Sequence, residues 1–196
     1  MKKKTELAIK EIYVGIRQYG NFLGTKMVHI ALTNPTTPSK NEIFKIKNVA
    51  DKVLQQKLGH VVFRDNDPMF QFKAIRNIVP LMPDCLVHLE TRGEEPIDDS
   101  HQLYVSVVPE RLDYLQRIGD ELIVPISQEI SLDSIDEYRR DANFDYYYLM
   151  PTNKSAVQTI VRLMNKMYGE RYNGRTTFGC WRLCIPYNLA SSFDLN

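Results

Sequence analysis

The chain has 196 residues, 43% of them hydrophobic, and a formal net charge of +1. This length suits one domain with a sizeable core, and the near-zero charge excludes a partner selected by the charge of the whole chain. No apolar run approaches the roughly 20 residues that cross a bilayer, and the basic start MKKKTELAIK lacks the apolar core of a signal peptide. We therefore expect a cytoplasmic protein with no membrane partner.

Strand-like and helix-like segments alternate along the chain. Near-continuous apolar runs predict strands of a parallel sheet at 27–32, 60–65, 85–91, 103–109, 121–126, 146–151 and 181–187. Apolar residues at helical spacing predict helices at 41–58, 70–78, 110–117, 131–141 and 154–168. The fold class we expect is α/β, a partial (open) parallel β/α barrel of about six strands with alternating helices, in one domain over residues 1–196.

Four residues mark the expected ends of two of these helices. Ser39 and Glu42 have the spacing of a capping box before the helix at 41–58, and Gly59 suits its C-terminal end. Asn153 is the expected N-cap of the helix at 154–168.

Charged residues follow the expected strands at the edge where such folds bind ligands. They are Asp65, Asp67, Glu90, Arg92, Glu94, Glu95 and Glu110. Carboxylates there could hold a divalent cation or perform acid–base chemistry. The alternative is a solvated rim of turn-forming and capping residues. The sequence shows no nucleophile–base motif and no phosphate-binding glycine loop.

Histidines and cysteines give weaker signals. His29, His60, His88 and His101 could join the acidic rim, although His29 and His88 fall inside expected strands. Cys85, Cys180 and Cys184 are too few for a disulfide framework, and no neighbouring histidine completes a metal set. We expect buried core thiols and satisfied or surface histidines.

The segment KMYGERYNGRTTFGCWR (166–182) mixes basic and aromatic residues. Arginines can contact phosphates while aromatic rings stack on bases. Lys166, Arg171, Tyr172 and Arg175 are therefore a candidate nucleic-acid or partner patch. The alternative is a helix end, a polar loop and a final buried strand.

Read in order, the segments resemble the 7-carboxy-7-deazaguanine synthase (QueE-like) radical S-adenosylmethionine (SAM) family. EIYVGIRQYGNFLGTKMVHIAL is similar to the family's opening, HVVFRDNDPMF to its G-G-E-P strand, and LVHLETRGEEP to its E-T-S/N-G strand. LYVSVVPERL resembles the V-S-P-K segment, and DELIVPISQEISLDSIDEY resembles the D-E-[LI]-K strand with the helix that follows it. YYYLMPTNKSAVQTIVRL resembles the L-Q-P strand and helix, and CWRLCIPYNLASSF the closing W-R-L-S-x-Q-x-H-K. The match spans nearly the whole chain.

The chemistry-bearing residues of that family are missing from this chain. Where the family places C-x3-C-x2-C, this sequence has LTNPTTPS, and thiolates are the usual ligands of a four-iron four-sulfur cluster. The family's G-E-G becomes Tyr19, Gly20 and Asn21, and its G-G-E-P becomes DNDP (65–68). Glu90, Thr91, Gly93, Pro109, Pro151, Trp181 and Arg182 are retained.

The resemblance therefore implies a scaffold without the chemistry. The expected function is that of a catalytically degenerate pseudoenzyme that binds a protein partner as a scaffold, inhibitor or regulatory subunit. No catalytic, cofactor or metal residue is assigned: a four-iron four-sulfur cluster and SAM are not expected, whereas a divalent metal stays open. The family implies a homodimer, and a relative reduced in this way is the sort of gene that a virus could carry. Metal-assisted enzyme chemistry at the rim and nucleic-acid binding are the two alternatives.

Overall fold

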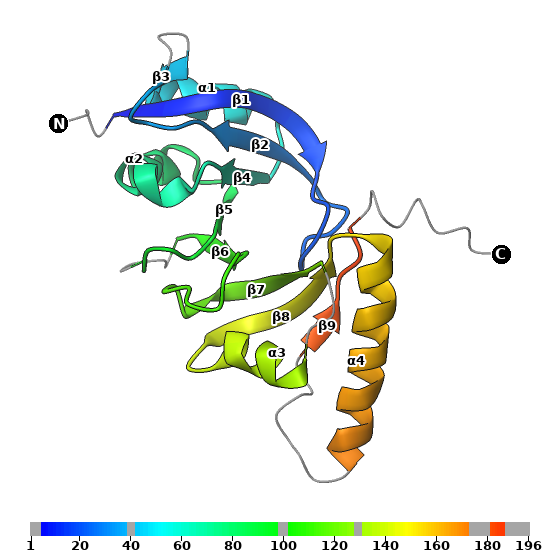
Figure 1. Ribbon diagram of the computed structural model, residues 1–196. Coiled ribbons are helices and arrows are strands. Elements are labelled where there is room, and N and C mark those ends of the chain that lie inside the picture. Colours follow the sequence, from blue (N-terminus) through cyan, green and yellow to red (C-terminus); the bar gives the residue numbers. More distant parts are fainter. Residues whose placement is uncertain (1–4, 39–41, 98–101, 128–130, 173–180, 187–196) are drawn as a thin grey trace.

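The computed structural model describes residues 5–38, 42–97, 102–127, 131–172 and 181–186. In these residues one nine-stranded sheet has the order β3-β1-β2-β4-β5-β6-β7-β8-β9, and its two edges do not pair with each other (Figure 1). The strands are β1 (Glu6–Ile16), β2 (Lys26–Leu32), β3 (Ile43–Lys45), β4 (His60–Asp65), β5 (Leu86–Thr91), β6 (Tyr104–Val107), β7 (Ile118–Ile126), β8 (Asn143–Pro151) and β9 (Trp181–Leu183).

Each adjacent pair from β2 through β4, β5, β6, β7 and β8 to β9 is parallel, whereas β1 is antiparallel to both of its neighbours, β2 and β3. Parallel neighbours place the carboxyl ends of β2 and of β4 through β9 at one edge of the sheet. The predicted α/β class and parallel pairing are confirmed. The expectation of about six strands is wrong, because β1 and β3 extend the sheet beyond β2.

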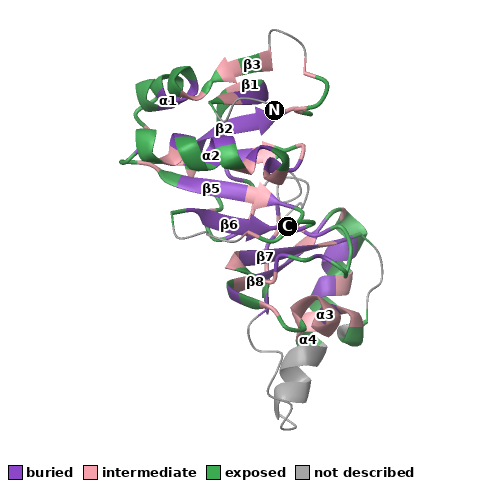
Figure 2. Cartoon of the chain, turned by 90° about the vertical axis from the view of Figure 1, so that its left-hand side faces the viewer, coloured by how far each residue is buried: buried purple, intermediate pink, exposed green. Residues whose placement is uncertain are grey.

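The helices are α1 (Ile46–Gln55), α2 (Phe72–Ile78), α3 (Leu132–Arg139) and α4 (Lys154–Tyr172), and η2 (Pro68–Gln71) and η3 (Val79–Leu81) are short 3-10 turns. All four α-helices bury side chains in one core cluster, for example Val53, Ile75, Ile135 and Ile160. That cluster also holds the strand residues that face the helices. The core therefore lies on one face of the sheet, where Figure 2 shows buried strand residues beneath helices with exposed outer surfaces.

Two predicted helices need correction. The helix expected at 41–58 begins only at Ile46, with Lys45 as N-cap, because residues 43–45 pair with β1 as β3. The expected capping box therefore does not form at this helix, and Ser39 lies outside the described residues. The C-cap of α1 is Gln56 rather than Gly59.

The segment 110–117 is not helical. The backbone N–H groups of Leu115 and Gln116 both donate to the carbonyl of Gly93, at 2.7 and 3.0 Å, so this segment folds back on the preceding strand connection. The connections β5–β6 and β6–β7 contain no helix in the described residues, so strands and helices do not alternate throughout.

The last helix is confirmed, including its cap. Asn153 Oδ1 accepts a hydrogen bond from the N–H of Ala156 at 2.9 Å, which satisfies one of the free donors of the first turn of α4. None of the described helices is long and apolar enough to cross a membrane.

Candidate functional site

The two faces of the sheet differ in chemistry. In β5, Val87 and Leu89 point into the helix-covered core, whereas His88 and Glu90 point to the opposite face. The same alternation places Tyr104 and Ser106 of β6 and Glu121 of β7 on that opposite face, which we call the inner face. All of these polar side chains except the half-buried Glu90 are buried, so another part of the chain must cover them.

Residues 17–25, which connect β1 to β2, cover the inner face. In Figure 1 this connection lies on the other side of the sheet from α2 and descends towards β7. Arg17 is only 1% exposed, although it carries a full charge. Its guanidinium donates to Glu90 Oε2 at 3.0 Å, Glu121 Oε1 at 2.8 Å and Ser106 Oγ at 3.1 Å.

The charges of this network balance locally. Burial lowers the pKa of Arg17, but Glu90 and Glu121 together outweigh that effect and hold the pKa above its ordinary value. Tyr19 donates its hydroxyl to Glu90 Oε1 at 2.6 Å, and burial, then Glu90, raises the pKa of this tyrosine. Arg64 of β4 adds a second guanidinium 3.4 Å from Glu90. The two guanidinium groups and the two carboxyl groups of this network therefore pair with one another.

Two backbone groups of the connection bind the sheet directly. Asn21 N–H donates to Glu121 Oε2 at 2.8 Å, and Gly20 N–H donates to Cys184 Sγ at 3.1 Å. Gly20 has φ +79°, and a Cβ at this position would lie 2.5 Å from a Glu121 carboxylate oxygen. Glycine is thus required here both by the backbone conformation and by the close approach to Glu121.

Aromatic rings continue the contact at the tip of the connection. Phe22 packs edge-on against His88 and Tyr104, with ring centroids 4.8 and 4.9 Å apart. His60 Nδ1 lies 3.0 Å from His88 Nε2. Burial, followed by the charge of Arg17, lowers the pKa of His88 to about 3.

His29 stacks on Tyr13 at 4.9 Å, and neither of its ring nitrogens has a hydrogen-bond partner among the described residues. Burial, then Arg64, lowers its pKa to about 4. Within the described residues no group of three His, Cys, Asp or Glu side chains could hold a metal ion, and His101 lies outside them. His29 and His88 are therefore neutral packing residues at pH 7.

The rim residues come together at the carboxyl ends of β4, β5, β6 and β7. One pocket of about 500 Å³ is lined by Asp65, Asn66, Asp67, Glu90, Thr91, Arg92, Val108, Glu110 and Pro125. Five of the predicted rim residues are thus in one pocket: Asp65, Asp67, Glu90, Arg92 and Glu110.

Asp67 is the most deeply buried carboxylate of this pocket. Its Oδ1 accepts from the N–H of Met69 at 3.0 Å and from the hydroxyl of Thr91 at 2.9 Å. Its Oδ2 has no hydrogen-bond partner in the described part of the chain, although the residue is only 6% exposed. Asp65, by contrast, is exposed, adopts φ +64° and pairs with Arg64 at 3.3 Å.

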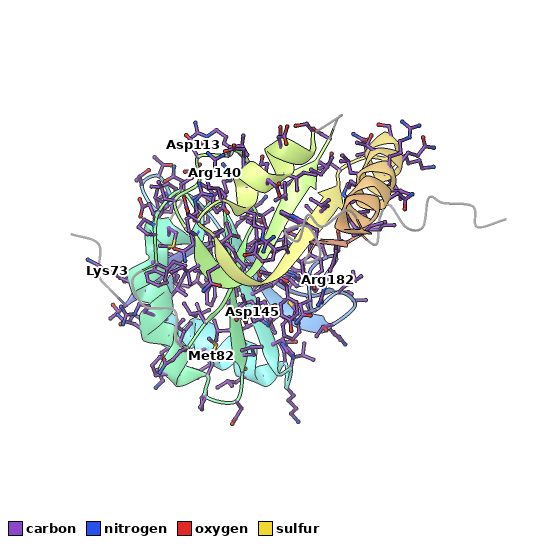
Figure 3. The ribbon with its side chains drawn as sticks, turned by 90° about the horizontal axis from the view of Figure 1, so that it is seen from below. Lys73, Met82, Asp113, Arg140, Asp145 and Arg182 are labelled. Atoms are coloured by element: carbon purple, nitrogen blue, oxygen red, sulfur yellow. The ribbon has the colours of Figure 1, made fainter. Side chains whose placement is uncertain are left out.

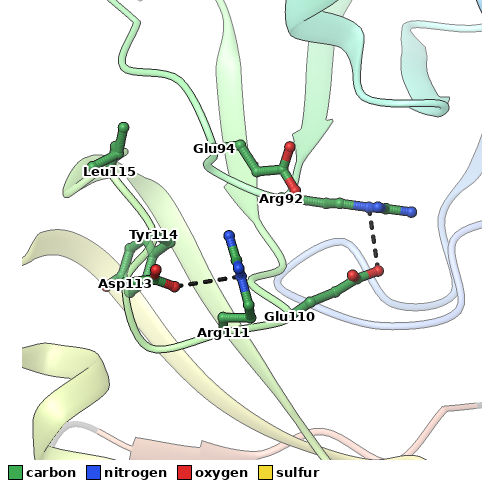
Figure 4. Close-up of a pocket in the computed structure, with 7 residues that line it drawn as sticks. All are labelled: Arg92, Glu94, Glu110, Arg111, Asp113, Tyr114 and Leu115. Atoms are coloured by element: carbon green, nitrogen blue, oxygen red, sulfur yellow. Dashed lines mark ion pairs between the residues drawn. The ribbon is translucent and has the colours of Figure 1, made fainter.

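A second pocket of about 310 Å³ adjoins the first and shares Arg92 and Glu110 with it (Figure 4). The remaining lining residues are Glu94, Arg111, Asp113, Tyr114 and Leu115. Figure 4 shows two ion pairs across it, Arg92–Glu110 at 3.3 Å and Arg111–Asp113 at 3.4 Å. Glu95 is exposed and does not line either pocket.

The basic–aromatic patch remains a prediction. The backbone of α4 includes Lys166, Arg171 and Tyr172, but their side chains, and Arg175 entirely, lie outside the described residues. Arg182, labelled in Figure 3, places its guanidinium 4.9 Å from the ring centroid of Tyr146. Trp181 is buried on the helix-covered face, as the alternative of a final buried strand predicts.

Sequence reasoning missed Arg17 and Glu121, which hold the inner face together. The available signal was GIRQYGNFLG (15–24), a charged, glycine-punctuated turn directly after an apolar segment. That signal identifies a turn but does not place the arginine inside the protein.

No family model matches the sequence, and no similar curated protein was found. Among solved structures, the chain is similar to the crystal structure of QueE from Escherichia coli. The TM-score is 0.61 over 92% of this chain and 93% of that chain, at 15% sequence identity. The fold is QueE-like. The structural likeness agrees with the resemblance noted from the sequence motifs and, at this identity, concerns the fold alone.

Proposed function

We propose that this chain is a catalytically degenerate 7-carboxy-7-deazaguanine synthase-like protein that holds no iron–sulfur cluster and acts by binding a protein partner. On this proposal the sheet is a radical-SAM-type partial barrel whose interior no longer serves chemistry. The observation that carries the proposal is the inner face, which residues 17–25 cover and Arg17 fastens to two strands. In a sheet of this kind the same face would otherwise be open to small molecules.

The loop after β2 does not fit an iron–sulfur cluster. Residues 33–38 are TNPTTP, and Asn34 Oδ1 accepts from the N–H and hydroxyl of Thr36 at 2.8 and 2.6 Å. The side chain of Asn34 is thus hydrogen-bonded within the loop. The loop offers hydroxyl and amide groups but no thiolate, and iron–sulfur clusters are held by cysteine thiolates.

The cysteines elsewhere do not replace that motif. Cys85 precedes β5 at the amino end of the strand, where its thiol contacts the carbonyl of Leu58, and Cys184 is buried after β9. Burial raises the pKa of both thiols, which disfavours the thiolate form that binds metal. Cys180 lies outside the described residues.

Anaerobic reconstitution with iron and sulfide tests the proposal. We expect close to zero iron and sulfide per chain, and no SAM cleavage with a chemical reductant. Incorporation of about four irons per chain, lost on replacing Cys85, Cys180 or Cys184 with serine, would contradict the proposal and would place a cluster at those cysteines.

A further inference from the structure

We infer that the two adjoining rim pockets form a docking groove for a basic and partly apolar segment of a partner protein. This inference rests on the proposed function, because it names the chemistry of the partner. The groove lies at the carboxyl edge of β4 to β7.

The groove is acidic although the whole chain has a formal charge of +1. Six carboxylates line the two pockets against the two guanidinium groups of Arg92 and Arg111. Arg17 and Arg64 pair with Glu90 and Asp65 behind this lining, and the six carboxylates still outnumber these two guanidinium groups and those of Arg92 and Arg111 together. The carboxylates are Asp65, Asp67, Glu90, Glu94, Glu110 and Asp113. Such a concentration of one sign favours a partner of the opposite sign.

Asp67 gives the groove a hydrogen-bond acceptor without a donor. It is 6% exposed, and Oδ1 already accepts two hydrogen bonds while Oδ2 has no partner among the described residues. A buried carboxylate oxygen without a donor is costly, and a charged N–H donor is the partner that relieves this cost best. The guanidinium of an arginine or the ammonium of a lysine has that chemistry. It would approach Oδ2 from the first pocket, which Asp67 lines, once the side chains that bury this oxygen move aside.

Exposed apolar side chains flank the acidic groove. Phe70 follows Asp67 by three residues and is exposed, and Leu115, which lines the second pocket, is 60% exposed. Leu112, two residues after Glu110 in the sequence, is also exposed, whereas Val108 and Pro125 line the first pocket. A segment with a basic residue beside an apolar one would satisfy both parts of this surface, which an isolated cation would not.

Selection from a displayed library of random nonapeptides on the immobilised full chain tests the inference. We expect the enriched peptides to carry an arginine or lysine next to a large apolar residue. Replacing that basic residue with citrulline or norleucine in the synthetic peptide should weaken binding at least about tenfold, and added salt should also weaken it.

Variants of the groove locate the binding. Asp67→Asn and Glu110→Gln should each weaken the peptide at least about tenfold, as expected on removing a charged hydrogen-bond partner. Glu110→Gln, at an exposed position, keeps the test valid if Asp67→Asn disturbs the turn that Asp67 caps. Glu11→Gln and Asp51→Asn remove exposed carboxylates outside the groove and should leave affinity unchanged.

Three outcomes would overturn the inference. The first is a selection that enriches acidic or uncharged peptides, or no peptide at all. The second is equal binding of the peptide to all variants. The third is full displacement of the peptide by millimolar spermidine or Mg²⁺, which would assign the groove to a small cation. Iron content measured on the same preparation separates the two proposals. A failed selection with no iron rejects the docking groove alone, whereas four irons per chain reject the proposed function.

Discussion

Replacing Arg17 with methionine is the sharpest test of the covered inner face. Methionine roughly keeps the volume but removes the hydrogen bonds to Glu90, Glu121, Ser106 and the carbonyl of Tyr19. Glu121 is 0% exposed and would be left as a buried carboxylate without a cation. Breaking a buried ion pair in this way costs about 3–5 kcal/mol of the free energy of unfolding. For a chain of this length that corresponds to a fall of roughly 6–20 °C in Tm.

Urea unfolding followed by circular dichroism and by the fluorescence of Trp181 measures this loss. Trp181 is the only tryptophan of the chain and is buried, so its emission reports the packing of β9. Arg92→Met is the matched control, because the Arg92–Glu110 pair is 52% and 63% exposed and is worth about 1 kcal/mol or less. Adding Glu121→Gln to Arg17→Met should restore at least about 1 kcal/mol, since no buried charge then lacks a partner. Equal losses for Arg17→Met and Arg92→Met would refute the reasoning.

The remaining predictions concern three other places in the fold. Gly20→Ala should lower the free energy of unfolding in urea by about 2 kcal/mol or more, because Gly20 has a positive φ and its added Cβ would meet the Glu121 carboxylate. Gly24→Ala is the control and should cost only about 1 kcal/mol, because Gly24 has φ +84° but no described atom within 4 Å of an added Cβ. The pKa of His29 is lowered to about 4 in the folded chain, so the unfolded chain binds this proton first and stability falls as the pH drops below about 6.5. Between pH 6.5 and 4.5 the free energy of unfolding should therefore fall by about 1–2 kcal/mol less in His29→Phe than in the wild type. An equal fall in both proteins would contradict the lowered pKa of His29. Asn153→Ala should lower the free energy of unfolding by about 1 kcal/mol through the lost cap of α4, and an unchanged midpoint would argue against that cap.

The parallel part of the sheet was predictable because its strands are buried on both faces. Strands such as β4 and β8 therefore appear as near-continuous apolar runs bounded by turn residues. β1 was missed because Lys10, Glu11, Val14 and Ile16 are all exposed, so it shows neither an apolar run nor a regular alternation. The residues of β3 were included in the predicted helix because Ile43 and Ile46 have helical spacing. Only the pairing with β1 identifies them as a strand.

The candidate site also has one part that the sequence predicts and one part that it does not. The rim could be predicted, because parallel strands bring their carboxyl ends to one edge whatever lies between them. The inner network could not, because Arg17 meets Glu90 and Glu121 across 73 and 104 residues of sequence. Nothing local in the sequence indicates that a charged turn residue folds inward, since an arginine in a glycine-rich turn is more often exposed.

The polarity of the inner face itself supports the proposed function. The opposite face shows that this sheet can pack its helices with apolar side chains alone. A buried ion network brings no clear advantage in stability over apolar residues of similar volume, so packing does not explain why Glu90, Ser106 and Glu121 lie on the inner face. A sheet that once turned this face to polar ligands would carry such residues, and it would then need a polar cover. Arg17 and the backbone of Gly20 and Asn21 supply that cover from the chain itself. The surface left for recognition is then the rim, where Asp65, Glu94, Glu110 and Asp113 are exposed.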